Sequence, residues 1–243
     1  MIFLFTDFGA ADIYVGQVKA VLHQRAPDAH VVDLLHEAPA FSVKAGAHLL
    51  AALAGRTPAG SVTVAIVDPG VGGRRRPVAL LADDRWFVGP DNGLLSVTAA
   101  RAGAADAFAI GWRPEHLSAS FHGRDLFAPV AALLARGDRQ AATLGKKSKL
   151  AESFGGEDLA EVIYVDHYGN AMTGLRAGGL PRNGRLVVDG RRIGRARVFS
   201  DLPHGEICWF ENSLGLAEIA ANAASAAEKL GLRVGNPVAL EPR

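Results

Sequence analysis

The sequence predicts two domains: an α/β N-terminal domain, with a largely parallel sheet and helices on both faces, and a smaller antiparallel β domain that fits a small barrel. Three observations support this. Up to residue 67, apolar strand-like segments alternate with helical ones in the order β-α-β-α-β. Residues 145–156 are rich in Gly, Lys and Ser, as linkers are. Short strand-like segments separated by Gly-rich turns follow. We therefore expect domains at residues 1–148 and 149–243.

Periodicity and turn residues define the elements of the first domain. Val15, Val18 and Leu22 recur at helical spacing, and an Asp-Asp turn joins two short apolar runs as a hairpin. The expected strands are residues 2–5, 30–34, 62–67, 78–82, 86–88 and 107–110. The expected helices are residues 13–25, 43–53, 94–100 and 126–135, the last preceded by a polar loop at 121–125.

The second domain is predicted to consist of shorter segments. Its expected strands are residues 161–165, 185–188, 197–199 and 207–210. The alanine-rich residues 216–230 predict a final helix, because alanine has the highest helix propensity.

Composition limits the class of protein. Charged residues make up 21% and apolar residues 49% of the 243 residues, which is typical of a globular protein. The formal net charge of +1 predicts no broad nucleic-acid or membrane surface. The single cysteine, Cys208, excludes an intrachain disulfide and a cysteine-rich zinc site. Without a signal-peptide pattern or an apolar run of membrane-spanning length, the expectation is a cytoplasmic protein.

Residues 61–76, SVTVAIVDPGVGGRRR, contain the main chemical signal of the first domain. The strand ends at Asp68, where open α/β sheets place their ligand crevice. The glycines that follow let backbone approach a ligand closely, and Arg75 could fold back to face the carboxylate. The alternative is an ordinary glycine-rich loop with a solvated basic run, and this stretch alone does not decide between them.

A second aspartate, Asp7, ends the first strand. If the two strands share a sheet edge, Asp7 and Asp68 enter one crevice, where an ionised carboxylate can accept two hydrogen bonds from a ribose diol. A loop acid or a helix N-cap is the alternative for Asp7. Asp12 is better explained as the N-cap of helix 13–25.

The histidines do not indicate a metal site. His122 lies in FHGRD, a turn before a helix, and a loop histidine is unremarkable by itself. His36 and His48 are conceivable ligands, but no HxH or HExxH spacing supports them. In the second domain, residues 166–170 (DHYGN) and 211–213 (ENS) fit either turns or binding loops.

Six motifs occur in order along the chain: TDFG, VDPGVGGRRR, VGPDNGLL, FHGRDLFAP, DHYGN and ENSLGLAEIA. With this set, nearly the whole chain resembles the S-adenosyl-L-methionine (SAM) hydroxide adenosyltransferases, or SAM hydrolases, relatives of fluorinase and chlorinase. The resemblance implies hydrolysis of SAM to adenosine and L-methionine by attack of water or hydroxide on ribose C5′, without a metal or other cofactor. It also implies a C-terminal β-barrel domain and a homotrimer, with sites between the N-terminal domain of one subunit and the C-terminal domain of the next.

The resemblance further implies residue roles, wherever the residues match. Asp68, Arg75 and His122 match the catalytic Asp–Arg–His set of the hydrolytic branch. The implied substrate contacts are Asp7 with the ribose hydroxyls, Phe41 beside the reacting carbon, Asp166 and Ser213 with the amino-acid end of methionine, Tyr168 stacked on adenine, and Asn170 with the backbone near Ala223 at the adenine edge.

Two other functions fit parts of the sequence. A non-catalytic adenosine- or SAM-binding module would use the same ribose acid and stacking ring, but would not need Asp68, Arg75 and His122 together. A halide-using 5′-halo-5′-deoxyadenosine synthase is the second alternative. The halogenating relatives lack the Asp–Arg–His set and line a halide pocket with small hydroxyl side chains, where this chain has Asp68, Val71 and Gly123.

Overall fold

The computed structural model describes residues 1–241, and the chain divides into two compact units, Met1–Gly156 and Glu157–Arg243. The division lies beyond the boundary expected after residue 148. Part of the expected linker is in fact a strand, β7 (Leu144–Ser148), which pairs with β6 (Ala105–Ile110) in the sheet of the first unit.

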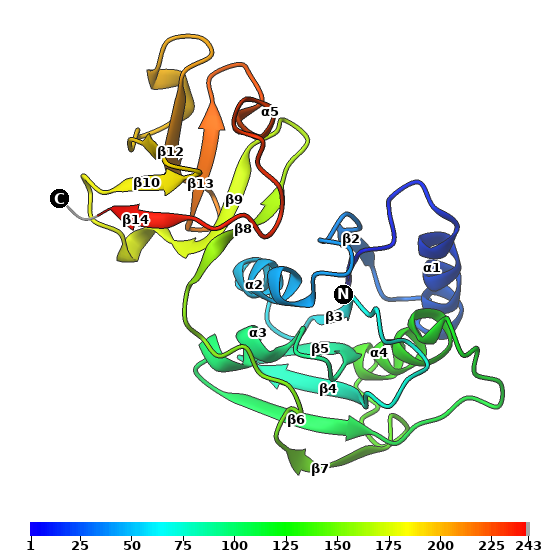
Figure 1. Ribbon diagram of the computed structural model, residues 1–243. Helices are drawn as coiled ribbons and strands as arrows, with labels where there is room; N and C mark the ends of the chain where they lie inside the picture. Colours follow the sequence, from blue (N-terminus) through cyan, green and yellow to red (C-terminus); the bar gives the residue numbers. More distant parts are fainter. Residues whose placement is uncertain (242–243) are drawn as a thin grey trace. The chain divides into compact units, whose positions relative to one another are not determined.

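The first unit contains a mixed seven-stranded sheet in the order β2-β1-β3-β5-β4-β6-β7 (Figure 1). Its other strands are β1 (Ile2–Thr6), β2 (Val31–Leu35), β3 (Val62–Ile66), β4 (Pro77–Ala82) and β5 (Arg85–Pro90). Strands β2, β1, β3 and β5 run parallel, whereas β4, β6 and β7 pair antiparallel with their neighbours. The expectation of a largely parallel sheet therefore holds for only half of it. The predicted hairpin turn at Asp83 and Asp84, both at positive φ, reverses the direction.

Helices cover both faces of this sheet, as predicted. They are α1 (Ile13–Arg25), α2 (Val43–Ala54), α3 (Ser96–Arg101) and α4 (Ala128–Ala135), with a single π-helical turn, η1 (Gly123–Phe127), before α4. Helices α1 and α4 pack together on one face, and α2 and α3 pack together on the other (Figure 1). The Asp12 carboxylate accepts a hydrogen bond of 2.7 Å from the Ile13 amide, which confirms the predicted N-cap.

The continuous apolar runs of β1 and β3 follow from this double cover. Every residue of both strands is buried. On β1, Ile2 and Leu4 join the core that also contains Val18 of α1 and Val130 of α4. Successive strand residues point to opposite faces, so Phe3, between Ile2 and Leu4, faces the other helix layer. Burial on both faces fixes the positions of β1 and β3, so the loops that follow their carboxyl ends begin from well-defined positions.

The second unit contains two antiparallel sheets. The strands are β8 (Leu159–Val165), β9 (Ala171–Arg176), β10 (Arg185–Val188), β11 (Arg191–Ile193), β12 (Ile207–Glu211), β13 (Leu216–Ala221) and β14 (Ala239–Glu241), with a short helix α5 (Ala226–Leu230). The four-stranded sheet has the order β12-β13-β9-β8 and the three-stranded sheet the order β11-β10-β14. Within the described residues neither sheet closes on itself, so the unit is antiparallel β as expected, without a demonstrated barrel.

Two predictions for the second unit were wrong, and the strands β9, β11 and β14 were not predicted. The expected helix 216–230 is instead β13 followed by α5, because all six residues of β13 are buried between β12 and β9. That packing outweighs the helix propensity of alanine. Residues 197–199 are not a strand; the chain enters a short 3₁₀ turn there, η3 (Phe199–Asp201). Strand β9 was missed because Gly174 interrupts its pattern, yet a Cβ there would lie 2.6 Å from Leu159, so close packing requires glycine.

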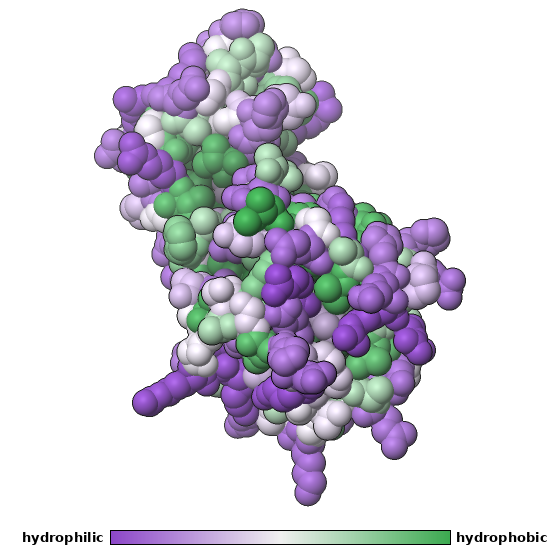
Figure 2. All heavy atoms as spheres, turned by 90° about the vertical axis from the view of Figure 1, so that its right-hand side faces the viewer, coloured by the Kyte–Doolittle hydropathy of each residue, from purple (hydrophilic) through white to green (hydrophobic). Residues whose placement is uncertain are grey.

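Among residues 1–241, no helix is both long and apolar enough to cross a membrane. Hydrophilic residues predominate on the face drawn in Figure 2, with apolar residues scattered among them. Among the exposed large apolar side chains are Phe41 and Tyr168, at 81% and 75% exposure, and both are predicted site residues.

Candidate active site

A hollow of about 100 Å³ lies beyond the carboxyl ends of β1 and β3 in the first unit. It is lined by Asp7, Phe8, Phe41, Ile66, Asp68, Pro69, Val71, Ser120, Phe121, His122 and Gly123. The structure thus brings four predicted site residues together: Asp7, Phe41, Asp68 and His122. The shared crevice expected for the two aspartates is present, because β1 and β3 are parallel neighbours.

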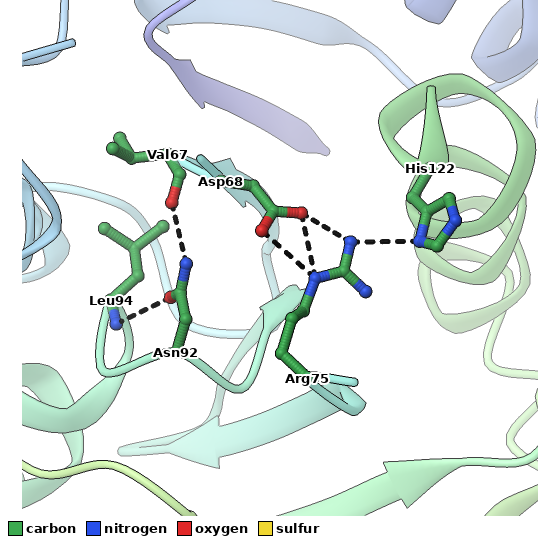
Figure 3. A network of polar contacts seen from close by, with 6 residues as sticks. All are labelled: Val67, Asp68, Arg75, Asn92, Leu94 and His122. Carbon is green, nitrogen blue, oxygen red and sulfur yellow. Dashed lines mark hydrogen bonds and ion pairs between the residues drawn. The ribbon is translucent and has the colours of Figure 1, made fainter. Parts of the chain in front are cut away.

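Arg75 connects Asp68 to His122 (Figure 3). Its Nε lies 2.9 Å from Asp68 Oδ2 and 3.1 Å from Oδ1, and its Nη2 also donates to Oδ2. The same Nη2 lies 2.9 Å from Nδ1 of His122. The Asp68 and Arg75 side chains are only 4% and 9% exposed, so solvent competes little for these bonds. Arg75 does not line the hollow; it holds the two residues that do.

The local sequence explains how these side chains meet. Strand β3 ends at Ile66, so Asp68 begins a loop with little side-chain bulk. Gly72 has φ of +76°, and a Cβ there would overlap the carbonyl of Ala119, so this loop packs directly on the segment before His122. His122 in turn precedes the π-helical turn η1. A π-turn is an uncommon element that often occurs at functional sites.

The hydrogen bonds define the protonation of His122. A guanidinium only donates, so Nδ1 of His122 must accept, and the neutral ring carries its proton on Nε2. Burial lowers the pKa of His122, and the positive charge of Arg75 lowers it further, against the opposing effect of Asp68 and Asp125. His122 is therefore a neutral imidazole near pH 7, with an Nε2–H donor.

Asp7 has the opposite electrostatic environment. Burial raises the pKa of its carboxyl and the charge of Asp68 adds to the rise, while the backbone N–H groups of Asp7 and Phe41 partly offset it. Phe41 has φ of +61°, a left-handed conformation that costs energy for a residue with a side chain. That conformation directs its backbone N–H to Asp7, while its ring remains exposed beside the hollow.

A second hollow, of about 560 Å³, lies in the second unit. Its lining is Asp166, Tyr168, Asn170, Phe199, Ala221, Ala223, Ala224 and Ser225. Four predicted residues therefore line one concave, mainly apolar surface: Asp166, Tyr168, Asn170 and Ala223. Ala223 has φ of +52°, a second non-glycine residue in the left-handed region beside a predicted ligand contact.

The loop after β8, residues 166–170, forms a turn and also lines the second hollow, so the two alternatives predicted for it are compatible. Asp166 Oδ1 accepts the amides of Tyr168 and Asn170, each at 2.9 Å, and its Oδ2 accepts Nδ2 of Asn170 at 3.0 Å. This Asx turn holds Asn170 in place and leaves the Tyr168 ring exposed. Ser213 lies on an exposed turn after β12 rather than in the lining of the hollow.

Phe199 and Asn92 are among the residues of these surroundings that sequence reasoning missed. Phe199 lines the second hollow, and its ring packs on Phe210 with centroids 5.8 Å apart. It fell in a segment predicted as a strand, so nothing marked it as a surface ring. Asn92, in the PDNG turn, bonds to the backbone next to Asp68 (Figure 3). The glycines and the proline around it signalled only a turn.

His36 and His48 have protein partners rather than a common metal site. Nδ1 of His36 lies 2.8 Å from Thr6 Oγ1 and its Nε2 lies 3.0 Å from Asp33 Oδ1. Nδ1 of His48 lies 3.4 Å from Arg101. Within residues 1–241, no three His, Cys, Asp or Glu side chains are grouped as a metal site would need.

Comparison with known families covers both units. Residues 2–145 match the family model of the SAM hydroxide adenosyltransferase N-terminal domain, and residues 160–239 match that of the C-terminal domain. The (R)-S-adenosyl-L-methionine hydrolase of Thermus thermophilus is 40% identical, over 98% of each chain. A fluorinase of Nocardia brasiliensis is more distant, at 25% identity over 95% of this chain and 93% of its own.

The fold also matches a solved structure over its full length. The crystal structure of an uncharacterized conserved protein from Thermotoga maritima is similar with a TM-score of 0.89 and 31% identity, covering 100% of both chains. The two family models therefore identify the family, and the structural match shows that the fold is shared with a solved protein.

Proposed function

The chain belongs to the SAM hydroxide adenosyltransferase family, and we propose that it hydrolyses S-adenosyl-L-methionine to adenosine and L-methionine by attack of water on ribose C5′. The observation that carries the mechanism is the buried chain of hydrogen bonds from Asp68 through Arg75 to His122, at the edge of the hollow in the first unit. A binding module would not require this arrangement.

In the proposed step, the oxygen of water forms a bond to C5′ while the bond from C5′ to the sulfonium sulfur breaks. The electrons of that bond go to sulfur, so methionine leaves as a neutral thioether. The attacking water loses one proton to solvent, so water and the sulfonium cation give adenosine, methionine and a solvated proton, and the charge balances. A sulfonium is already a good leaving group, so the difficult part is the nucleophile, and neither a general acid nor a cofactor is needed.

His122 and Arg75 have distinct parts in this proposal. The Nε2–H of His122 donates to the attacking oxygen and favours its hydroxide-like form, because His122 lines the hollow and its Nδ1 is already occupied by Arg75. Arg75 is a positioning residue, since it does not line the hollow, and Asp68 fixes the guanidinium. The negative charge of the hydroxide-like oxygen and the positive charge of the sulfonium both diminish in the transition state, so a site with little water favours the transition state.

The remaining roles complete the proposal. Asp7 binds the ribose hydroxyls and Phe41 borders the reacting carbon. Tyr168 stacks on adenine, while Asn170 and the backbone at Ala223 contact its edge. Asp166 and Ser213 hold the amino-acid end of methionine. We also propose a cytoplasmic homotrimer in which each site takes the first unit of one subunit and the second unit of the next. Its support is that each unit holds a separate hollow with part of the implied contacts.

The test of the reaction is direct. The purified protein is incubated with SAM, and the products are separated by chromatography. Adenosine and methionine in equal amounts are expected. Recovery of intact SAM, together with tight SAM binding in a calorimeter, would instead support the binding module.

The residue roles predict different kinetic effects. His122→Ala and Arg75→Ala should lower kcat by about 10²-fold or more with little change in KM, because His122 acts on the nucleophile and Arg75 positions His122. Asp7→Ala should mainly raise KM for SAM, because it removes a ribose contact. Steady-state kinetics of the three variants distinguish these outcomes, and equal losses of binding and turnover in all three would contradict the roles.

The halide-using alternative is disfavoured by packing at Gly123. A Cβ there would lie 3.0 Å from Cδ1 of Ile66 and 3.1 Å from the ring of Phe8. A hydroxyl side chain therefore cannot be added at this position without displacing the wall of the hollow. A chloride-dependent 5′-chloro-5′-deoxyadenosine product in the same chromatographic assay would support the alternative.

A further inference from the structure

The loop of residues 67–76 carries both Asp68 and Arg75, yet its composition favours mobility. Gly70, Gly72 and Gly73 widen the range of backbone conformations that the unbound loop can adopt. Inside the loop, the backbone bonds are few: Val71 N to Asp68 O at 3.2 Å and Gly73 N to Gly70 O at 3.0 Å. Apart from the packing of Gly72 on Ala119, the positions of Asp68 and Arg75 therefore depend on how the two ends of the loop are held.

Asn92 holds the first end (Figure 3). Its Nδ2 donates to the carbonyl of Val67, the residue before Asp68, at 2.9 Å. Its Oδ1 accepts the Leu94 amide at 3.2 Å, which fixes the orientation of the side-chain amide. Val67 lies just beyond β3 and is fully buried, so without Asn92 its carbonyl would lose a donor where water does not easily replace it.

Asp91 holds the second end. Its carboxylate, 1% exposed, pairs with Arg76, the residue after Arg75, at 2.6 Å to Nη2 and 3.1 Å to Nε. The Asp91 amide also donates to the Arg76 carbonyl at 2.8 Å. Two consecutive residues of one turn thus fasten the residue before Asp68 and the residue after Arg75.

We propose that Asp91 and Asn92 are positioning residues for catalysis: they fix both ends of loop 67–76 so that Arg75 bridges Asp68 to His122. The inference rests on the proposed hydrolysis for its kinetic consequence, but its geometric claim concerns His122 alone. It gives a role to the PDNG motif, which none of the substrate contacts uses.

The decisive variant is Asn92→Asp, which keeps the size of the side chain and the acceptor for Leu94 but replaces the donor to Val67 with a carboxylate oxygen. The first end of the loop, which carries the Val67 carbonyl, should move away from the new carboxylate at position 92, because two acceptor oxygens repel each other. We expect kcat to fall about 10- to 100-fold, the scale of small misplacements in active sites, while KM for SAM changes little.

A purely structural role would not move the titration of His122, so that titration is the second readout. The charged groups facing His122 are Arg75, Asp68, Asp125 and Arg113. If the loop retreats, burial and the charge of Arg75, the two largest causes of the lowered pKa, weaken together with the smaller raising effect of Asp68, so the pKa of His122 should rise. The acid limb of the kcat profile should move to higher pH, and the ring signals of His122 in NMR spectra should titrate at higher pH.

Two further variants make the test robust. Arg76→Gln, at a side chain 45% exposed, releases the second end and should shift His122 in the same direction with a smaller loss of kcat. Asp83→Ala is the matched control: it removes two bonds, to the amides of Gly103 and Ala104, in an exposed turn away from the loop. It should lower Tm without moving the His122 titration. If Asn92→Asp does not fold, Arg76→Gln decides.

The outcomes separate the inference from the proposed function. Wild-type kcat and an unshifted His122 titration in a folded Asn92→Asp variant would overturn the inference, as would a lower Tm alone. A wild-type protein that releases no adenosine would overturn the proposed function. The NMR titration would still test the positioning role in that case.

Discussion

At the scale of single residues, Asp7 illustrates a conflict between stability and binding. Burial raises its pKa, which means that the folded protein disfavours the charged form. Stability associated with this group is fully present below the unfolded pKa, near 3.8, and is lost as the pH rises through the higher folded pKa. At neutral pH, an ionised Asp7 therefore destabilises the fold, which agrees with the proposed role of its carboxylate in binding the ribose.

Replacing this charge should stabilise the protein and weaken binding. We expect Asp7→Asn to raise Tm at pH 7, because the amide is not ionised, and to raise KM for SAM, because it accepts fewer hydrogen bonds from a diol. The gain in Tm should disappear below about pH 3.8, where the carboxyl is protonated in both states. Thermal unfolding at several pH values measures this, and a lower Tm at neutral pH would contradict it.

At the scale of elements, the approach of β5 to β3 sets the position of the crevice. A Cβ on Gly89 of β5 would overlap the carbonyl oxygen of Ala65 on β3. Glycine is therefore required where β5 passes the carbonyl of Ala65, and β3 leads directly into the loop that carries Asp68.

A methyl group at Gly89 should force these strands apart. We expect Gly89→Ala to reduce the free energy of unfolding by about 1–3 kcal/mol, as overpacked cores do. Denaturant titration measures this loss. Gly55→Ala, at the end of α2 with nothing within 4 Å of the added Cβ and φ of −67°, is the control and should be neutral or stabilising by about 0.4–1 kcal/mol. Equal effects of the two substitutions would refute the role of the close approach.

At the scale of the whole molecule, the last residues of the first unit are fastened to it. The Asp91 carboxylate accepts the amide of Ala151 at 2.9 Å, Ser96 Oγ accepts that of Phe154 at 3.1 Å, and Arg101 donates to the Gly156 carbonyl at 3.1 Å. These bonds explain why the first unit extends to Gly156 rather than ending at residue 148.

The proposed homotrimer predicts complementation between inactive subunits. His122→Ala damages the first unit and Tyr168→Ala the second, so a site that combines units from two subunits can be intact in a mixed trimer. A one-to-one mixture refolded together should recover about a quarter of wild-type activity at low SAM, and light scattering should give about three times 25.5 kDa. No recovery in a verified mixed trimer would mean that each site draws on one subunit only.

The sequence determined much of the first unit and the identity of its chemistry. Continuous apolar runs required strands covered on both faces. Asp12 was predicted as the N-cap of α1 because its carboxylate can accept a hydrogen bond from an unpaired amide at the start of the helix. The motif order identified the family. These features depend on local physics or on residue types in a fixed order, so they can be read without coordinates.

Tertiary structure alone decided the rest. The alanine-rich run at Leu216–Ala221 became a central strand because its neighbours bury it, which no local propensity reports. Asp68 and Arg75 are seven residues apart, and the sequence allowed either a contact between them or a solvated loop. The structure shows the contact, because Arg75 bonds to both Asp68 and His122 in a buried position. The contact of Asn92 with the loop that carries Asp68 became visible only from its hydrogen bond to the carbonyl of Val67. A hydrogen bond between distant segments depends on how the chain folds back on itself, and that is decided by the packing of the whole unit.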